Sequence, residues 1–185
     1  YKRQAIYKPQ NSYIIIIRNP IQRFISAFYW RHYLITNKLI DKKKKGKTYL
    51  APYGNLEGEK DFFNKYNNVN DLCKDIALNS NILDDFKVVN HMNMGIYFYL
   101  ENLIDTCPRK NILGVICLET ISYDMKKIFN INIKSHNKNN NGYSKDITPQ
   151  NYNILKIYLD KDYQIIEKMY QKGWINDIQY SILKT

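Results

Sequence analysis

The sequence predicts an α/β domain in which a central parallel sheet is flanked by layers of helices. Two continuous apolar runs, Ser12–Arg18 and Ile112–Leu118, have the β-branched composition of strands that are buried on both faces. Each run is followed by a segment with helical spacing, so the order strand then helix occurs twice. At 185 residues with 44% apolar side chains, the chain can bury one core, and we expect a single domain over residues 1–185.

The first run leads directly into a predicted helix. Asn19 is a favoured helix cap and Pro20 a favoured first helical residue. The apolar residues that then repeat at helical spacing are Ile21, Phe24, Ile25 and Phe28. We therefore expect a helix from about Pro20 to Leu39.

Further helices are predicted by apolar spacing and by start and stop signals. Short helices are expected over about Val69–Leu78, Met94–Ile104 and Tyr123–Phe129. A last long helix is expected to begin at Thr148-Pro149 and to end near Gly173.

Two segments have the composition of loops. Residues 41–60 contain a run of four lysines followed by proline and glycine, which predicts a mobile surface loop. Its charge is typical of a solvated segment, with an electrostatic funnel for an acidic acceptor as the alternative. Residues 134–148 are rich in asparagine and are expected to be a loop or a segment ordered by a ligand.

Composition narrows the class of partner without fixing it. The 28 Lys+Arg and 17 Asp+Glu leave a net charge of +11, which favours a nucleotide, nucleic acid, acidic polysaccharide or membrane surface. No apolar run approaches the roughly 20 residues needed to span a bilayer, so we expect a soluble domain. The chain begins at Tyr1 rather than Met, so an upstream anchor stays possible, and the location stays open between cytoplasm and Golgi lumen.

The residues that carry chemistry are Arg18 and Ser26. Arg18 stands at the carboxyl end of a predicted strand, where ligands of open α/β sheets bind, and Ser26 stands two turns into the next helix. A phosphate at this edge can receive a guanidinium fork, a hydroxyl and backbone N–H groups. The structural alternative is that Arg18-Asn19-Pro20 only ends a strand and caps a helix.

The segment Arg18-Asn-Pro-Ile-Gln-Arg-Phe-Ile-Ser26-Ala-Phe-Tyr29 resembles the 3'-phosphate-binding motif of the sulfotransferase family, in its carbohydrate-type version. That family carries Arg-(Asn/Asp)-Pro with a serine eight positions after the arginine. The resemblance implies a P-loop-like three-layer fold. It also implies that Arg18 and Ser26 hold the 3'-phosphate of 3'-phosphoadenosine 5'-phosphosulfate (PAPS), the sulfate donor.

Weaker similarities to the same family continue along the chain. Gly95-Ile-Tyr97, a strand ending in Glu119 and followed by Asp124, and Tyr158 with Asp162-Tyr163 are similar to its middle and last segments. The polar segment 134–148 resembles the loop that closes over the nucleotide. The resemblance therefore implies three more nucleotide-binding residues, which are Lys138, Ser144 and Lys145.

One feature of the family is missing from the sequence. Its 5'-phosphosulfate loop, a Gly/Ser/Thr-rich turn with a lysine, should precede Arg18, but residues 1–17 contain no glycine. We therefore expect either an N-terminally incomplete domain or a relic that only binds. No catalytic base is assigned for the same reason.

The expected reaction is transfer of a sulfuryl group from PAPS to a hydroxyl of a carbohydrate-like acceptor, with 3',5'-adenosine bisphosphate (PAP) as product. No metal is expected, because no His/Cys/Asp cluster has ligand spacing. The alternatives are a non-catalytic module that binds a nucleotide or polyanion and, as a reading we do not favour, a nucleic-acid-binding domain. The oligomeric state is left open.

Overall fold

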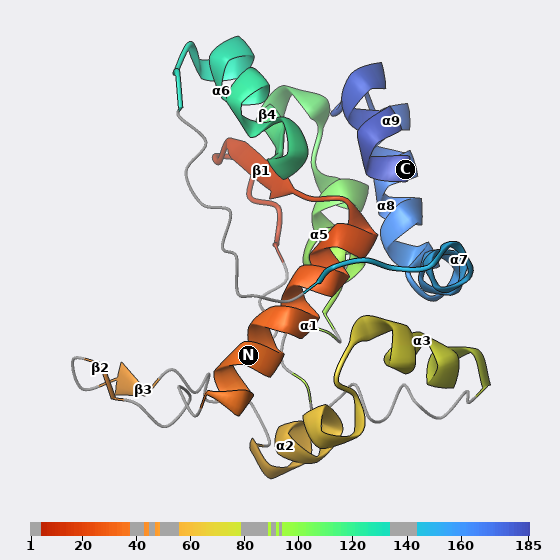
Figure 1. Ribbon diagram of the computed structural model, residues 1–185. Helices are drawn as coiled ribbons and strands as arrows, with labels where there is room; N and C mark the ends of the chain where they lie inside the picture. The colour runs from red at the N-terminus through yellow and green to blue at the C-terminus, as the bar shows by residue number, and fades with distance from the viewer. Residues whose placement is uncertain are drawn as a thin grey trace. The chain divides into compact units, whose positions relative to one another are not determined.

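The computed structural model describes residues 5–37, 43–44, 47–48, 56–78, 89, 92, 94–133 and 144–185. The chain divides into two compact units (Figure 1). The first unit comprises Tyr1–Gln22, Gly95–Asn139 and Leu159–Thr185. The second unit comprises Arg23–Met94 and Asn140–Tyr158. The chain, which we expected to form a single domain, thus contains two compact units. The boundary between them falls within one continuous helix, α1 (Pro20–Thr36).

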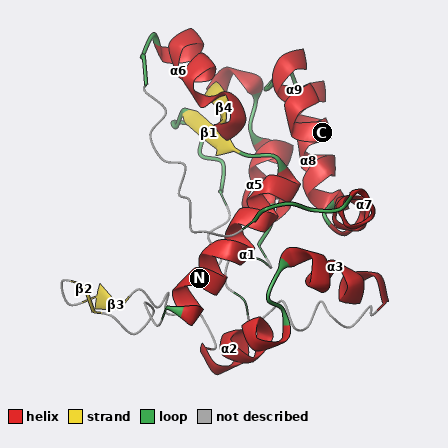
Figure 2. Cartoon of the chain, in the orientation of Figure 1, coloured by secondary structure: helices red, strands yellow, loops and turns green. Residues whose placement is uncertain are grey.

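The first unit contains a parallel pair of strands, drawn in yellow in Figure 2. β1 (Tyr13–Ile17) pairs with β4 (Ile112–Cys117), with Ile17 beside Cys117 at the carboxyl ends. The described part of this unit also contains four helices and two 3-10 turns: α5 (Ile96–Thr106), η1 (Arg109–Asn111), η2 (Leu118–Thr120), α6 (Ile121–Phe129), α8 (Asp160–Gln171) and α9 (Asp177–Lys184). α6 packs on β4, and α8 packs on both α5 and α9.

A carboxylate from α8 caps the start of α5. Gly95, the cap residue of α5, provides no side chain, and Asp162 Oδ1 instead accepts the N–H of Tyr97 at 2.9 Å. A Cβ added at Gly95 would lie 2.2 Å from the same oxygen, so only glycine leaves room for this carboxylate. Gly95-Ile-Tyr97 and Asp162, which the sequence analysis matched to the sulfotransferase family as separate segments, therefore contact each other and form one helix cap.

The second unit is helical around an aromatic core. It contains most of α1 together with α2 (Leu56–Lys65), α3 (Val69–Leu78), α7 (Pro149–Tyr158) and a short antiparallel pair, β2 (Lys43–Lys44) and β3 (Lys47–Thr48). Phe28 of α1 packs edge-on against Phe63 of α2, with ring centroids 5.3 Å apart. His32 stacks on Phe28 and is also buried.

A buried ion pair joins α1 to α2 in the second unit. Arg31 contacts the carboxylate of Glu59, and the two side chains are 4% and 0% exposed. Charged side chains are rarely buried this completely unless they are paired. The pair therefore fixes where the two helices meet.

The expected fold class is wrong. Over the described residues the protein is mostly helical, and it is not a three-layer domain with a central parallel sheet. Among the described residues the parallel sheet has only the two strands β1 and β4.

The physical reason is that an apolar strand need not be buried on both faces. Gly114 of β4 lies against Ile128 of α6, so this helix covers the β4 side of one sheet face. On the same face of β1, Ile14 and Ile16 stay 49% and 61% exposed. The continuous apolar run therefore predicted the strand correctly, but the prediction that helices cover both faces of this strand was wrong.

Most predicted elements form, with differences at breaks and ends. Both strands and the helices expected near Pro20, Val69, Met94 and Tyr123 are confirmed. The prediction of one long last helix is wrong, because the segment breaks at Leu159 into two helices, α7 and α8. α8 does end near Gly173, whose φ of 65° suits glycine. α2 and α9 were not predicted.

The two predicted loops lie partly outside the described residues. Within 41–60, the described residues are those of β2 and β3 and the first five residues of α2. Within 134–148, residues 144–148 are described and are neither helix nor strand.

Candidate anion site at the end of the parallel strands

Arg18 follows directly after β1, at the edge where both parallel strands end. Because Ile17 and Cys117 are paired, the residues after them lie at the same edge of the sheet. Arg18 Nε lies 3.5 Å from Glu119 Oε1, which comes from the turn η2 after β4. The side chains of Arg18 and Glu119 are 31% and 24% exposed, so the pair is in reach of solvent.

The carboxylate of Glu119 contacts the ends of both strands. Oε1 also accepts the backbone N–H of Asn19 at 3.1 Å, and Oε2 accepts the thiol of Cys117 at 2.9 Å. Burial, and then the hydrogen bond to Glu119, raise the pKa of Cys117 to about 12, so this thiol stays protonated and donates. One acidic side chain thereby joins β1, β4 and Arg18.

Asn19 links the same edge to two helix ends. Its Oδ1 accepts the N–H of Gln22 at 3.0 Å, which caps α1 as the sequence predicts. Its Nδ2 donates to the carbonyl oxygens of Leu183 at 3.2 Å and Ile182 at 3.4 Å, in the last turn of α9. The side chain is almost completely buried, so these are structural contacts.

Asp124 is a structural residue behind this edge. Its Oδ2 accepts the backbone N–H of Cys117 at 2.8 Å, the hydroxyl of Thr120 at 3.0 Å and the amide of Gln179 at 3.0 Å. The carboxylate is buried and ties β4 and α6 to α9. It therefore braces the strand end and takes no part in the site itself.

Three of the other predicted site residues, Ser26, Ser144 and Lys145, belong to the second unit. Ser26 is half-buried in the second turn of α1. Ser144 and Lys145 are exposed before α7, and the Ser144 hydroxyl donates to Asp146 Oδ2 at 2.6 Å. Lys138 lies outside the described residues. The contacts within the first unit thus join Arg18 to Glu119 and Asn19 rather than to another residue predicted for the site.

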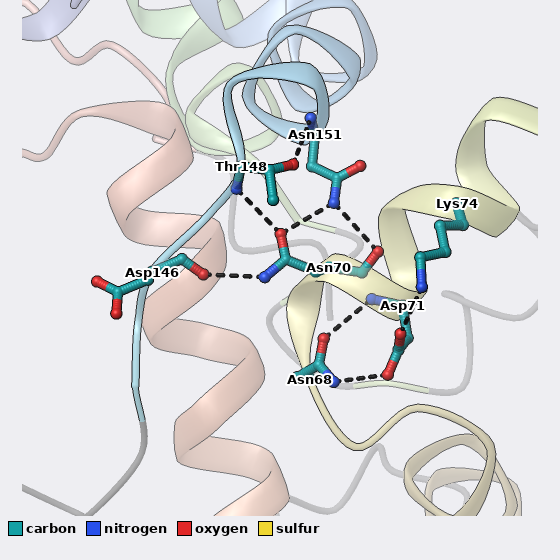
Figure 3. Close-up of polar contacts among 7 residues, drawn as sticks. All are labelled: Asn68, Asn70, Asp71, Lys74, Asp146, Thr148 and Asn151. Carbon is teal, nitrogen blue, oxygen red and sulfur yellow. Dashed lines mark hydrogen bonds and ion pairs between the residues drawn. The ribbon is translucent and has the colours of Figure 1, made fainter.

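The segment that carries Ser144 and Lys145 is anchored by an asparagine (Figure 3). Asn70, in the first turn of α3, donates from Nδ2 to the carbonyl oxygen of Asp146 at 3.0 Å, and its Oδ1 accepts the N–H of Thr148 at 3.1 Å. Asn151 of α7 adds a bond to the same Oδ1 at 2.9 Å. The side-chain amide of Asn70 therefore both donates and accepts as a backbone peptide group would, and it holds residues 146–148 against α3.

The sequence analysis selected neither Glu119 nor Asn19 for the site. The available signal was positional, since Glu119 stands just after the second of two parallel strands and therefore at the same edge as Arg18. His32 of the second unit is a packed residue rather than a candidate base. It stacks on Phe28 with ring planes 19° apart, and burial lowers its pKa below the ordinary value.

The described part of the chain lacks two kinds of feature. No three His, Cys, Asp or Glu side chains gather into a group that could hold a metal ion. No described helix combines the length and the apolarity required to cross a membrane.

Comparison with known proteins gives one distant similarity. The chain is 27% identical over 175 residues to the uncharacterized protein PFD1115c of Plasmodium falciparum (isolate 3D7), a stretch that covers 93% of the chain. The chain spans about a tenth of that protein's length, since the match covers 10% of it. No family model matches the chain, and no solved structure matches it.

Proposed function

We propose that the protein binds the 3'-phosphate of PAPS with Arg18 and Ser26, and that it transfers the sulfuryl group to a hydroxyl of a carbohydrate-like acceptor. The observation that carries the proposal is the placement of Arg18. Its guanidinium is partly exposed at the carboxyl edge of two parallel strands and directly before a helix. A guanidinium offers a planar fork of donors that matches two phosphate oxygens.

The surroundings of Arg18 fit a phosphate group. α1 carries no acidic residue of its own in its first turn, and the negative charge at its start is that of Glu119, which accepts the N–H of Asn19. Glu119 contacts Arg18 at Nε, which is one of the five N–H donors of a guanidinium. The net charge of +11 favours an anionic ligand in general.

The roles of Arg18 and Ser26 in such a reaction are binding and orientation. PAPS supplies the sulfuryl group, and in-line transfer resembles phosphoryl transfer, in which positioning and charge stabilisation provide most of the rate. Arg18 donates to the 3'-phosphate, and Ser26 adds a hydroxyl donor from α1. Both residues hold the donor at a point remote from the reacting sulfur.

A second candidate is a module that binds the same nucleotide, or another polyanion, without catalysis. The placement of Arg18 supports it equally well, because a partly exposed guanidinium at the strand edge binds an anion without any reacting group. Both candidates use the same arginine. They differ in whether the bound donor is turned over.

The experiment is a calorimetric titration with PAP, followed by an assay of sulfuryl transfer. Arg18→Ala should weaken PAP binding by about tenfold or more, since it removes hydrogen bonds to a charged group. Ser26→Ala should weaken it by less. Lys110→Ala is the matched control, because it removes an exposed positive charge outside the site and should leave affinity nearly unchanged.

Two outcomes separate the candidates. Transfer of labelled sulfate from PAPS to a polysaccharide acceptor, lost in Arg18→Ala, supports the enzyme. Tight PAP binding without transfer to any acceptor supports the binding module. Equal PAP affinity in the wild type and in both site variants would contradict both candidates.

A further inference from the structure

Glu119 occupies an unusual place for an acidic residue beside a proposed anion site. Its carboxylate contacts Arg18 at Nε while it also accepts from Asn19 and Cys117, which belong to the ends of different strands. These other contacts fix the carboxylate to the sheet. A fixed carboxylate at Nε restrains the plane in which the guanidinium lies, because its five donors share one plane.

We propose that Glu119 is a positioning residue that gives the site its preference for a 3'-phosphorylated nucleotide. This inference rests on the proposed binding of the 3'-phosphate by Arg18. Glu119 does not touch the ligand. It holds the guanidinium in the orientation that presents its other donors to the phosphate, so that less side-chain freedom is lost on binding.

The negative charge of Glu119 by itself would lower the preference for PAP, whereas the positioning of Arg18 raises it. A carboxylate beside the site repels every anion, and it repels PAP more than adenosine 5'-monophosphate (AMP), because PAP carries one more phosphate group. Removing that charge without any loss of orientation should therefore increase the preference for PAP over AMP. Removing the orientation should decrease this preference, since only PAP has the phosphate that Arg18 would contact. The sign of the change thus distinguishes positioning from simple repulsion.

The test measures the dissociation constants of PAP and AMP by calorimetry in the 185-residue protein and its variants. Glu119→Gln removes the charge and keeps an oxygen that accepts the N–H of Asn19. We expect the ratio of the AMP to the PAP dissociation constant to fall about tenfold, the size expected when a hydrogen bond to a charged group is weakened. The control Glu101→Gln removes an exposed carboxylate from α5 and should leave the ratio within about twofold, as expected of a distant surface charge.

A double variant shows whether Glu119 acts through Arg18. Arg18→Ala alone should lower the ratio, and adding Glu119→Gln to it should lower it no further. Arg18→Lys provides a second route if Glu119→Gln does not fold. It keeps the charge but lacks the planar fork, and it should also lower the ratio about tenfold, again the size expected for one hydrogen bond to a charged group.

The outcomes separate this inference from the proposed function. An unchanged or raised ratio in folded Glu119→Gln overturns the positioning role, provided that Arg18→Ala lowers it. An unchanged ratio in Arg18→Ala overturns the proposed function, and the inference with it. A ratio unchanged in Arg18→Lys likewise overturns the positioning role.

Discussion

Removal of one partner from the buried pair of Arg31 and Glu59 should destabilise the second unit strongly. Glu59→Gln keeps the size of the side chain and removes its charge, which leaves the guanidinium of Arg31 without its counter-charge at a position only 4% exposed. Breaking a buried pair from one side costs about 3–5 kcal/mol. Single domains have unfolding free energies of roughly 5–15 kcal/mol, so the loss is a large share of the total.

Replacing both partners should cost much less. Arg31→Met with Glu59→Leu removes both charges and fills the space with apolar side chains of similar length. Such replacements are often neutral or stabilising by about 1–4 kcal/mol, because two desolvation penalties disappear. The cycle of single and double variants should therefore show a large coupling energy between the two positions.

The chain offers a probe for each unit. Trp30 lies in the second unit and is 42% exposed, whereas Trp174 lies in the first unit and is 4% exposed. In a Trp174→Phe background, tryptophan fluorescence during urea unfolding reports the second unit through Trp30. Glu59→Gln should lower the midpoint of this transition, and the double replacement should restore most of it.

Two results would refute this reasoning. A loss below about 1 kcal/mol in Glu59→Gln would mean that the pair behaves as a surface ion pair. A double replacement as unstable as the single variant would mean that the helices depend on the charges themselves. Lys74→Ala, which removes an exposed pair with Asp71, is the matched control and should change stability by less than about 1 kcal/mol.

Three more predictions follow from individual contacts. Gly95→Ala should lower the unfolding free energy by about 1–3 kcal/mol, because the new Cβ displaces Asp162 from the cap of α5, and Asp162→Ala should make the added methyl group tolerable. Asn19→Asp keeps the cap of α1 but sets a carboxylate against the last carbonyls of α9, so urea unfolding should show a larger loss than in Asn19→Ser. Burial lowers the pKa of His32 below its ordinary 6.5, so the unfolded state binds the proton more tightly and stability should fall as pH falls below about 6.5. His32→Phe should reduce that pH dependence in urea titrations, and an unchanged profile would contradict it.

The sequence predicted the strands and helices whose ends are determined by residues adjacent to them in the chain. The run from Ile14 to Ile17 is β-branched throughout, and Pro20 marks a helix start, so the end of β1 and the start of α1 follow from local chemistry. The break at Leu159 has no such signal, since neither proline nor glycine occurs at that position. The number of strands in the sheet was equally inaccessible, because it depends on which distant segments pair.

The candidate site was predictable only in part for the same reason. Arg18 was identified from its place after a strand, and this placement is confirmed. Its contact with Glu119 joins residues about a hundred positions apart and depends on the register of two parallel strands. The anchoring of residues 146–148 by Asn70 depends on one side-chain amide that no pattern of hydrophobicity reveals.

The two hydrogen bonds from Asn19 to the last turn of α9 affect when this part of the protein can fold during synthesis. Asn19 and Leu183 are separated by 164 positions, so the acceptors for this amide leave the ribosome long after Asn19 does. Contacts of such large separation form slowly, since a long loop must close first. During synthesis the segment around Arg18 therefore lacks these two hydrogen bonds until α9 has been translated.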